Sequence, residues 1–406
     1  MAVAEYEDLE EIDDDLEEDV SSPSMKQLMS MPLSNFDAKE RYIADRIPED
    51  YATFPKHIKL MENTGIGDVV REQALAFLPA KSLCRFKTVS KEWDQWINNP
   101  FFVHIQTTQF KSVSGLFCQL PGESPSFISL DTTAFGVPNA GLSFLPEPVD
   151  IRTTCNGLIC CQGRGENQAY YVCNPVNKGW WMLPKPKLYH GRQTAIALAF
   201  EPAIFNFNAN YELICVIKMP DTCVLYFEIY SSRTDSWRIS ETVCFELDAL
   251  ALNGDGFYMK GYAYWETQCD AILAFDVKYE SYGMLSLPPG SGPNGALTEM
   301  RGNLYYLMPR KQDACSIEVY GDINMSLKHV IPLDPKDMGN MDGLCRALSF
   351  VNDDTFILEL ERKIIAYNAT SHKVECLRNA SDYKGFAKYL PYVNSLVTVS
   401  HPVPSI

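Results

Sequence analysis

The sequence predicts a mainly β fold in which a small all-α module of three helices precedes a β-propeller. Turn residues followed directly by an apolar strand recur about every 48 residues from Gly157 to Ser395, which is the period of a propeller blade. A second pair of strands, joined by a polar hairpin turn, follows most of these turns. Four short strands in each repeat favour six blades, and seven blades would require another half-blade in the front segment.

The segment 66–102 predicts the three helices. Asp68 is suited to cap the first helix, and Pro79 ends that helix and suits the first turn of the second. Ser90 is suited to cap the third helix, and Pro100 ends it after two asparagines. The apolar side chains that recur at helical spacing are Val70, Ala74, Phe77, Leu78, Leu83, Phe86, Trp93, Trp96 and Ile97. So short a module buries little surface, so its apolar faces need a partner or a neighbouring domain.

The strand-rich region holds five complete blades between about Ile151 and Ala380. The strand-like segments left over are SGLFCQL, SFISL and LSFLP before these blades, and FAKYLPYVNSLVTV after them. We expect both groups to build a sixth blade together, because such closure protects two sheet edges that would otherwise be exposed. The predicted parts of the chain are an acidic disordered tail and linker (1–62), the helical module (63–106) and the propeller (107–406).

The formal net charge of -17 argues against non-specific binding to nucleic acids and to anionic membranes. Much of this charge is local, because 11 of the 15 residues in the segment 5–19 are acidic. Such a run is typical of a solvated, disordered tail. The alternative function for it is an acidic arm that recruits a basic partner.

The cysteines and the lack of targeting segments indicate an intracellular protein. The sequence shows no signal peptide and no run of about 18 apolar residues that could span a bilayer. Its 13 cysteines are scattered and include no CxxC pair. An odd number of scattered thiols favours a reducing compartment, so we expect the cytoplasm, the nucleus or both.

The motifs of catalysis and of metal binding are missing from the sequence. The six histidines never fall at HxH, HxxxH or HExxH spacing. The Gly-rich segment 290–295 lacks a following Lys-Ser/Thr pair, which predicts a loop and not a phosphate site. No GxSxG motif occurs, and no cysteine has a nearby histidine that would mark a nucleophile. We therefore expect no catalytic residue, no metal and no cofactor, and a binding function carried by loops.

The loop 184–193 is the leading candidate for contact with a target. It brings cations and an aromatic side chain together in an otherwise acidic protein: Lys185, Lys187, Tyr189, His190 and Arg192. This composition predicts an acidic or phosphorylated partner. The alternative is a solvated basic loop without a partner.

Two groups of segments resemble a known family. LPAKSLCRFKTVSKEW followed by INNPFF resembles the second half of a plant F-box. The first half departs from that pattern, with Ile66-Gly67 in place of Leu-Pro, and Val70-Arg71 and Gln73 in place of a leucine pair and a glutamate. CNGLICC, YYVCNPVNKGWWMLP and YSSRTDSWRIS resemble the Kelch-like, F-box-associated domain of plant F-box proteins, without the Gly-Gly doublet of Kelch repeats.

The resemblance implies a substrate-recognition subunit of an SCF-type ubiquitin ligase, in which a Skp-type adaptor, a cullin and a RING protein are the other subunits. The F-box would dock the adaptor and the propeller would hold an unknown target protein, while other subunits transfer ubiquitin. Nucleic acids and membranes are not expected partners, and the chain itself would not be an enzyme. The residues expected to bind the adaptor are Ile66, Val70, Leu75, Leu78, Pro79, Leu83, Phe86, Val89 and Trp93.

Two other functions stay open at this point. Gly67, Arg71 and Gln73 favour a degenerate F-box, and the protein would then be a non-ligase scaffold or inhibitor that uses its propeller to bind proteins. An enzyme is the third hypothesis, because propellers host catalytic sites in their central channel. No motif supports it, and it would require histidine and carboxylate side chains that converge in the channel.

Overall fold

The computed structural model describes residues 74–203, 205–218, 224–245, 252, 254–288, 290–292, 294–300, 302–311, 315–322, 324–333, 345–360, 363–379 and 387–399. The chain divides into two compact units, Met1–Leu60 and Met61–Ile406, and every described residue belongs to the second. The acidic tail and the expected adaptor contacts Ile66 and Val70 lie outside the described residues.

The helical module contains η3 (Leu75–Phe77), α4 (Ala80–Phe86), α5 (Lys91–Ile97) and α6 (Pro100–Gln109). As predicted, Ser90 caps α5, and its Oγ accepts the N–H of Trp93 at 3.3 Å. The third helix ends before Pro100, as predicted. Pro100 is also the first residue of a further helix, α6, which Asn99 caps because its Oδ1 accepts the N–H of Phe101 at 2.8 Å. The prediction missed α6 because it used the proline only as a stop signal, whereas proline also suits the first position of a helix.

The strands of the described residues form six antiparallel sheets. The first two sheets of four strands are β3 (Val149–Cys155), β4 (Leu158–Gly163), β5 (Tyr170–Asn174) and β6 (Gly179–Met182), and β7 (Ala195–Ala199), β8 (Glu212–Lys218), β9 (Leu225–Ser231) and β10 (Ser236–Cys244). The third is β11 (Phe257–Met259), β12 (Tyr262–Glu266), β13 (Ala271–Asp276) and β14 (Ser281–Ser286). The fourth and fifth are β15 (Ala296–Met300), β16 (Asn303–Lys311), β17 (Cys315–Gly321) and β18 (Ser326–Pro332), and β19 (Cys345–Phe350), β20 (Thr355–Leu360), β21 (Lys363–Asn368) and β22 (Lys373–Asn379). Each of these five sheets takes its strands in chain order, as expected for a propeller blade.

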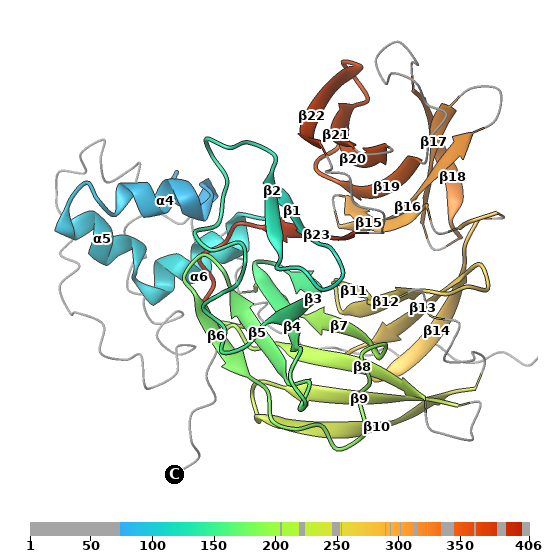
Figure 1. Ribbon diagram of the computed structural model, residues 1–406, viewed down its shortest axis with the longest axis horizontal. Helices are drawn as coiled ribbons and strands as arrows, with labels where there is room; N and C mark the ends of the chain where they lie inside the picture. The colour runs from blue at the N-terminus through green and yellow to red at the C-terminus, as the bar shows by residue number, and fades with distance from the viewer. Residues whose placement is uncertain are drawn as a thin grey trace, which may run out of the picture. The chain divides into compact units, whose positions relative to one another are not determined.

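The sixth sheet joins strands that are far apart in the sequence. It consists of β1 (Val113–Gln119), β2 (Ser126–Ser129) and β23 (Lys388–Val393), in the order β2-β1-β23. β1 pairs antiparallel with β23, with Leu116 opposite Pro391, and Figure 1 shows these two segments side by side despite their distance along the colour bar. The protein is therefore a six-bladed β-propeller, and the predicted closure by both ends of the region is confirmed.

Two predicted strands of the sixth blade are wrong. LSFLP (142–146) is not a strand, because Leu142 has a φ of 52° and the segment forms turns. Leu142 and Leu145 nevertheless pack in the core between the sixth and first sheets. The apolar pattern therefore predicted the burial of both residues correctly. The segment 394–399 leaves the sheet after Val393 and makes no strand.

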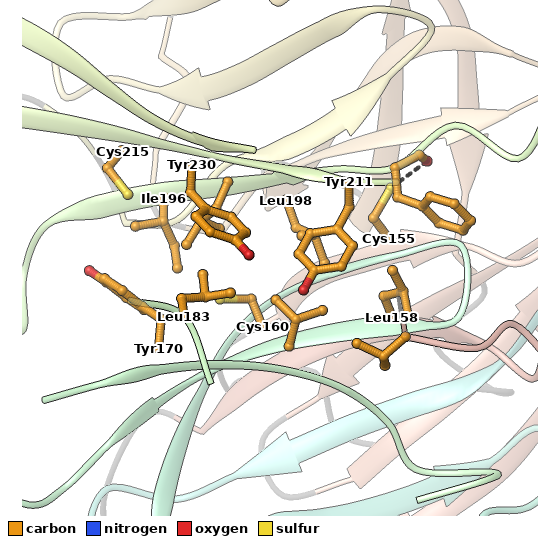
Figure 2. Packing of buried hydrophobic residues seen from close by; sticks show 14 of the residues in the cluster. Cys155, Leu158, Cys160, Tyr170, Leu183, Ile196, Leu198, Tyr211, Cys215 and Tyr230 are labelled. Carbon is orange, nitrogen blue, oxygen red and sulfur yellow. Dashed lines mark hydrogen bonds between the residues drawn. The ribbon is translucent and has the colours of Figure 1, made fainter. Parts of the chain in front are cut away.

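The hydrophobic core lies between neighbouring blades. Six clusters of buried side chains each join two adjacent sheets, and together they close the circle. Figure 2 shows the cluster between the first two sheets, where Tyr170 and Cys160 face Ile196 and Tyr211. The closing cluster brings Leu116 of β1 against the fifth sheet. Aromatic side chains such as Trp265, 1 % exposed, fill the spaces between the blades.

The turn signature that reveals the repeat has a conformational cause. The turn between β3 and β4 places Asn156 and Gly157 at φ of 46° and 96°, and the turn between β11 and β12 places Lys260 and Gly261 at 47° and 89°. Two successive residues with positive φ are the requirement of the tight hairpin that matches the twist of paired strands. The recurring polar-Gly pair therefore marks the first hairpin of these blades.

Candidate functional site: the helical module, the basic loop and the central cavity

The residues predicted to bind an adaptor differ in exposure. Among the described ones, Leu75 and Leu83 are 1 % and 0 % exposed, and Pro79 is also buried. Leu78, Phe86 and Trp93 are half-buried, and the rings of Phe86 and Trp93 lie 5.3 Å apart. Val89 is 63 % exposed. Phe77, at 59 %, was missing from the predicted set although it follows the same helical spacing.

The buried members of this set pack between the helices and the propeller. Leu75, Ala80 and Leu83 form a cluster with Leu396, and Val176 of the turn between β5 and β6 packs against it. The N–H of Ala80 donates to the carbonyl of Asn394 at 3.1 Å. The module thus buries one apolar face against the propeller itself, which supplies the neighbouring domain that its small size requires.

Gln106 of α6 links the module to the 394–399 segment. Its side chain is 0 % exposed. The Nε2 donates to the carbonyl of Leu78 at 3.1 Å, and the Oε1 accepts the N–H of Leu396 at 3.0 Å. Thr107, the next residue, places its Oγ1 3.2 Å from the Oγ of Ser395. These buried polar groups satisfy one another's hydrogen bonds, which favours a single geometry for the contact.

The 394–399 segment is in turn held by the first blade. Asn174 Nδ2 donates to the carbonyls of Ser395 and Val397 at 3.0 and 2.7 Å, and its Oδ1 accepts the hydroxyl of Tyr392 at 2.9 Å. Asn177 Nδ2 donates to the carbonyl of Val397 at 2.9 Å. The segment is therefore a layer of backbone between the helices and the blade, with hydrogen bonds to both.

A third contact comes from the loop after β2. Lys81 Nζ of α4 donates to the carbonyls of Thr132 and Phe135, and Arg85 Nη1 donates to the carbonyl of Thr133 at 3.0 Å. The module consequently lies on the propeller face that carries the turns β3–β4 and β5–β6. We call this the near face, and the opposite one the far face.

The basic loop, residues 183–194, connects β6 of the first sheet to β7 of the second. It follows β6, and β6 begins at the turn that contacts the module, so the loop leaves the other end of the strand. Lys185, Lys187 and Arg192 are exposed, and Tyr189 is 83 % exposed. His190, predicted to share this surface, lies inside, with 3 % of its side chain exposed.

A central cavity of about 900 Å³ runs between the blades, lined largely by the first strands of the sheets and by β23. Toward the far face it meets a buried ionic cluster. Arg152 Nη2 lies 2.7 Å from Asp255 Oδ1, and Lys388 Nζ also contacts Asp255. Burial alone would raise the pKa of Asp255, but Lys388 and Arg152 outweigh it and hold that pKa below its usual value.

The carboxylate of Glu266 lines the cavity. Among the described residues, no group of three or more His, Cys, Asp or Glu side chains is arranged to hold a metal ion. Burial raises the pKa of Glu266 to about 7, and the Leu297 N–H that it accepts at 2.9 Å lowers it less. No histidine lines the cavity beside it in the described part of the chain.

Among the described residues, no helix is long and apolar enough to cross a membrane.

The closed circle of sheets and the helices seated on its near face define the described chain as a β-propeller protein with an attached helical module. Residues 142–399 match the model of the F-box associated beta propeller domain. That match covers more than half of the chain, and the chain belongs to this family. This family model describes an F-box associated propeller and does not show the Kelch-like character that the sequence predicts.

Curated proteins that the chain resembles include F-box proteins of Arabidopsis thaliana. F-box protein At5g07610 is 28% identical over 306 residues, which cover 66% of this chain and 70% of that protein. F-box protein At5g49610 is 30% identical over 233 residues, 54% of this chain and 64% of that protein. F-box protein At5g03970 is 25% identical over 227 residues, 51% of this chain and 53% of that protein. The chain thus spans less than two thirds of the second and third of these relatives.

Proposed function

We propose that the protein is the substrate-recognition subunit of an SCF-type ubiquitin ligase. In this proposal the helical module docks a Skp-type adaptor, and the propeller holds the target while other subunits transfer ubiquitin. Membership of the F-box associated propeller family and the F-box proteins among its relatives support the proposal. The cysteines of the described residues are all free, which supports action in the reducing cytoplasm or nucleus.

The observation that carries the proposal is the seat of the helical module. Buried hydrogen bonds and apolar packing fix the helices to the near face, while Phe77 and Val89 remain exposed beside half-buried Leu78, Phe86 and Trp93. Exposed apolar side chains on a fixed support are typical of a protein-docking surface. Such a support would hold the propeller, and hence the target, at a constant distance from the catalytic subunit.

The predicted adaptor-binding residues divide into two roles within this proposal. Val89, Phe86, Leu78 and Trp93 would contact the adaptor, together with Phe77. Leu75, Pro79 and Leu83 would act from beneath by holding the helices on the propeller. Ile66 and Val70 remain predictions outside the described residues.

Co-expression of the full chain with a Skp-type adaptor tests the proposal. We expect the wild-type chain and the adaptor to elute together in size-exclusion chromatography, and the double variant Phe77→Asp/Val89→Asp to elute alone. A charge placed on a desolvated apolar contact removes most of the binding energy of that contact. Tyr279→Asp is the matched control, because Tyr279 is an equally exposed apolar side chain, at 72 %, in the turn between β13 and β14. A wild-type chain that elutes without the adaptor contradicts the ligase function.

One observation favours a second candidate function. Gly67, Arg71 and Gln73 depart from the F-box pattern, which favours a scaffold or inhibitor with a degenerate F-box. That function predicts that the wild-type chain does not bind the adaptor. It also predicts that the substitutions Ile66→Leu and Gly67→Pro, with Arg71→Leu, create adaptor binding.

A further inference from the structure

The backbone of the basic loop (183–194) is held at several points by buried or half-buried side chains. Trp237 Nε1 donates to the carbonyl of Pro184 at 2.6 Å. Arg152 Nη2 donates to the carbonyl of Thr194 at the other end of the loop. Between these ends, the side chain of Glu228 holds the middle of the loop. A long surface loop with anchors at both ends and in the middle has little conformational freedom left.

Glu228 is the central anchor. Its side chain is 0 % exposed, and its carboxylate accepts the N–H groups of Lys187 and Leu188 at 2.7 and 3.1 Å. The same carboxylate lies 2.9 Å from Nε2 of His190, and the His190 ring packs edge-on against Trp237. Burial alone would raise the pKa of Glu228, but the bond to His190 and the two backbone N–H groups outweigh it and lower that pKa. The carboxylate therefore stays ionised and keeps its three donors.

The side chains that this loop directs outward are cationic and aromatic. Lys185, Lys187 and Arg192 are exposed, and Tyr189 is 83 % exposed although its neighbours Leu188 and His190 are held inward. A buried carboxylate is costly in free energy, and here it fixes a surface loop. Because the buried carboxylate of Glu228 binds His190, it does not pair with the side chains of the three exposed cations.

We propose that the basic loop is a preorganised docking site for an acidic peptide segment of a protein. Lys185, Lys187 and Arg192 would pair with its carboxylates, and the exposed ring of Tyr189 would pack on the peptide between them. Charge complementarity selects this occupant, because the cations have the opposite sign to clustered Asp and Glu. The proposal rests on the proposed function only in taking this segment to be part of the target.

The point where the loop leaves β6 makes the proposed site compatible with adaptor binding. The loop leaves the end of β6 opposite to the turn that contacts the helical module. A peptide on the basic loop and an adaptor on the module are therefore expected to bind at the same time. Loss of either interaction can be measured without loss of the other.

The test measures binding of a fluorescein-labelled peptide of alternating Glu and Ser to the full chain by fluorescence anisotropy. The loop variant Lys185→Gln/Lys187→Gln/Arg192→Gln is expected to bind about ten-fold more weakly, since three surface ion pairs are lost. Arg233→Gln/Lys278→Gln/Lys373→Gln is the matched control. It removes the same charges from exposed positions at the hairpin turns of three other blades, and its affinity should change by less than about two-fold. Tyr189→Ser should also weaken binding of the peptide.

A second variant separates preorganisation from simple charge. Glu228→Gln makes the region more positive, so charge alone predicts equal or tighter peptide binding. Preorganisation predicts weaker binding, because the variant loosens the loop. Circular dichroism and the retained adaptor complex show that this variant is folded.

Four results would overturn the proposal: equal weakening by the control variant, equal binding of a Gln/Ser peptide, tighter binding by Glu228→Gln, or equal binding of a single-stranded RNA. The last would identify a non-specific polyanion site. Adaptor co-elution distinguishes this failure from that of the proposed function, because the loop variant should keep the adaptor. A chain that binds the acidic peptide but no adaptor overturns the ligase function alone.

Discussion

The side-chain oxygen of Gln106 in α6 accepts a hydrogen bond of 3.0 Å from the backbone N–H of Leu396, although 290 positions separate the two residues along the chain. The same amide reaches the carbonyl of Leu78. One buried side chain therefore connects the start of the module, its last helix and the segment that follows the final strand.

Gln106→Ala should destabilise the protein by about 2 kcal/mol, because it leaves the N–H of Leu396 and the carbonyl of Leu78 buried without their partner. Chemical denaturation followed by tryptophan fluorescence measures this change. Gln95→Ala on the exposed side of α5 is the control and should leave the free energy of unfolding unchanged. A Gln106→Ala variant as stable as wild type would mean that the amide is not needed to seat the module.

Asp255→Asn should destabilise the protein by about 3 kcal/mol at pH 7, since it leaves Arg152 buried beside a neutral group. The folded pKa of Asp255 is lowered below its usual value of 3.8. Its contribution is therefore fully present above that usual value and is lost as the pH falls through the lower folded pKa. Wild type and variant should thus differ in melting temperature at neutral pH and converge in strong acid. Glu166→Gln, at an exposed turn, should show no such convergence.

Glu266→Gln should have the opposite effect. Burial raises the pKa of Glu266 to about 7 from 4.5, so the unfolded chain loses its proton first and wild-type stability falls as the pH rises from 4.5 to 7. The glutamine variant lacks this loss and should be more stable by on the order of 2 kcal/mol at pH 8, with no difference near pH 4. Melting curves across this range measure it. A variant that is less stable at pH 8 would show that the ionised carboxylate is needed there.

Gly157→Ala should be more destabilising than Gly261→Ala, although both glycines have positive φ in equivalent turns. A Cβ at Gly157 would lie 2.7 Å from the Cβ of Ser395, whereas one at Gly261 meets nothing within 4 Å. Gly261→Ala should therefore cost about 1 kcal/mol from backbone strain alone. Gly157→Ala should cost about 2 kcal/mol more, because the 394–399 segment must move. Equal unfolding free energies for the two variants would contradict this close contact.

The repeat and the closure of the circle were predictable because both follow from local patterns in the sequence. A positive-φ turn pair such as Asn156-Gly157 and the apolar strand after it are properties of neighbouring residues, and their spacing predicts a blade. The unpaired strand-like segments at both ends then predict a shared sheet, since an open edge is unfavourable. The apolar sequence pattern also predicted the burial of Leu142, but it did not predict the turn conformation of that residue.

The proposed binding surfaces were less predictable because they depend on distant contacts. His190 belongs to a basic loop in the sequence, yet a carboxylate on β9, Glu228, draws it inside. Leu83 has the spacing of an exposed docking residue, yet Leu396 covers it. No local pattern in either segment encodes such a partner. The role of Gln106 was missed for the same reason, because a polar residue between apolar ones is ordinary on a helix surface.

The position of β23 has a consequence for synthesis of the protein on the ribosome. The sixth sheet and the seat of the helices both need residues 388–399, so neither forms until that stretch has left the exit tunnel. A chain interrupted earlier exposes the bare edge of β1 and the apolar underside of the helices, two features that chaperones and proteases recognise. The sixth sheet and the contact between the helices and the propeller therefore form only after residues 388–399 have been synthesised.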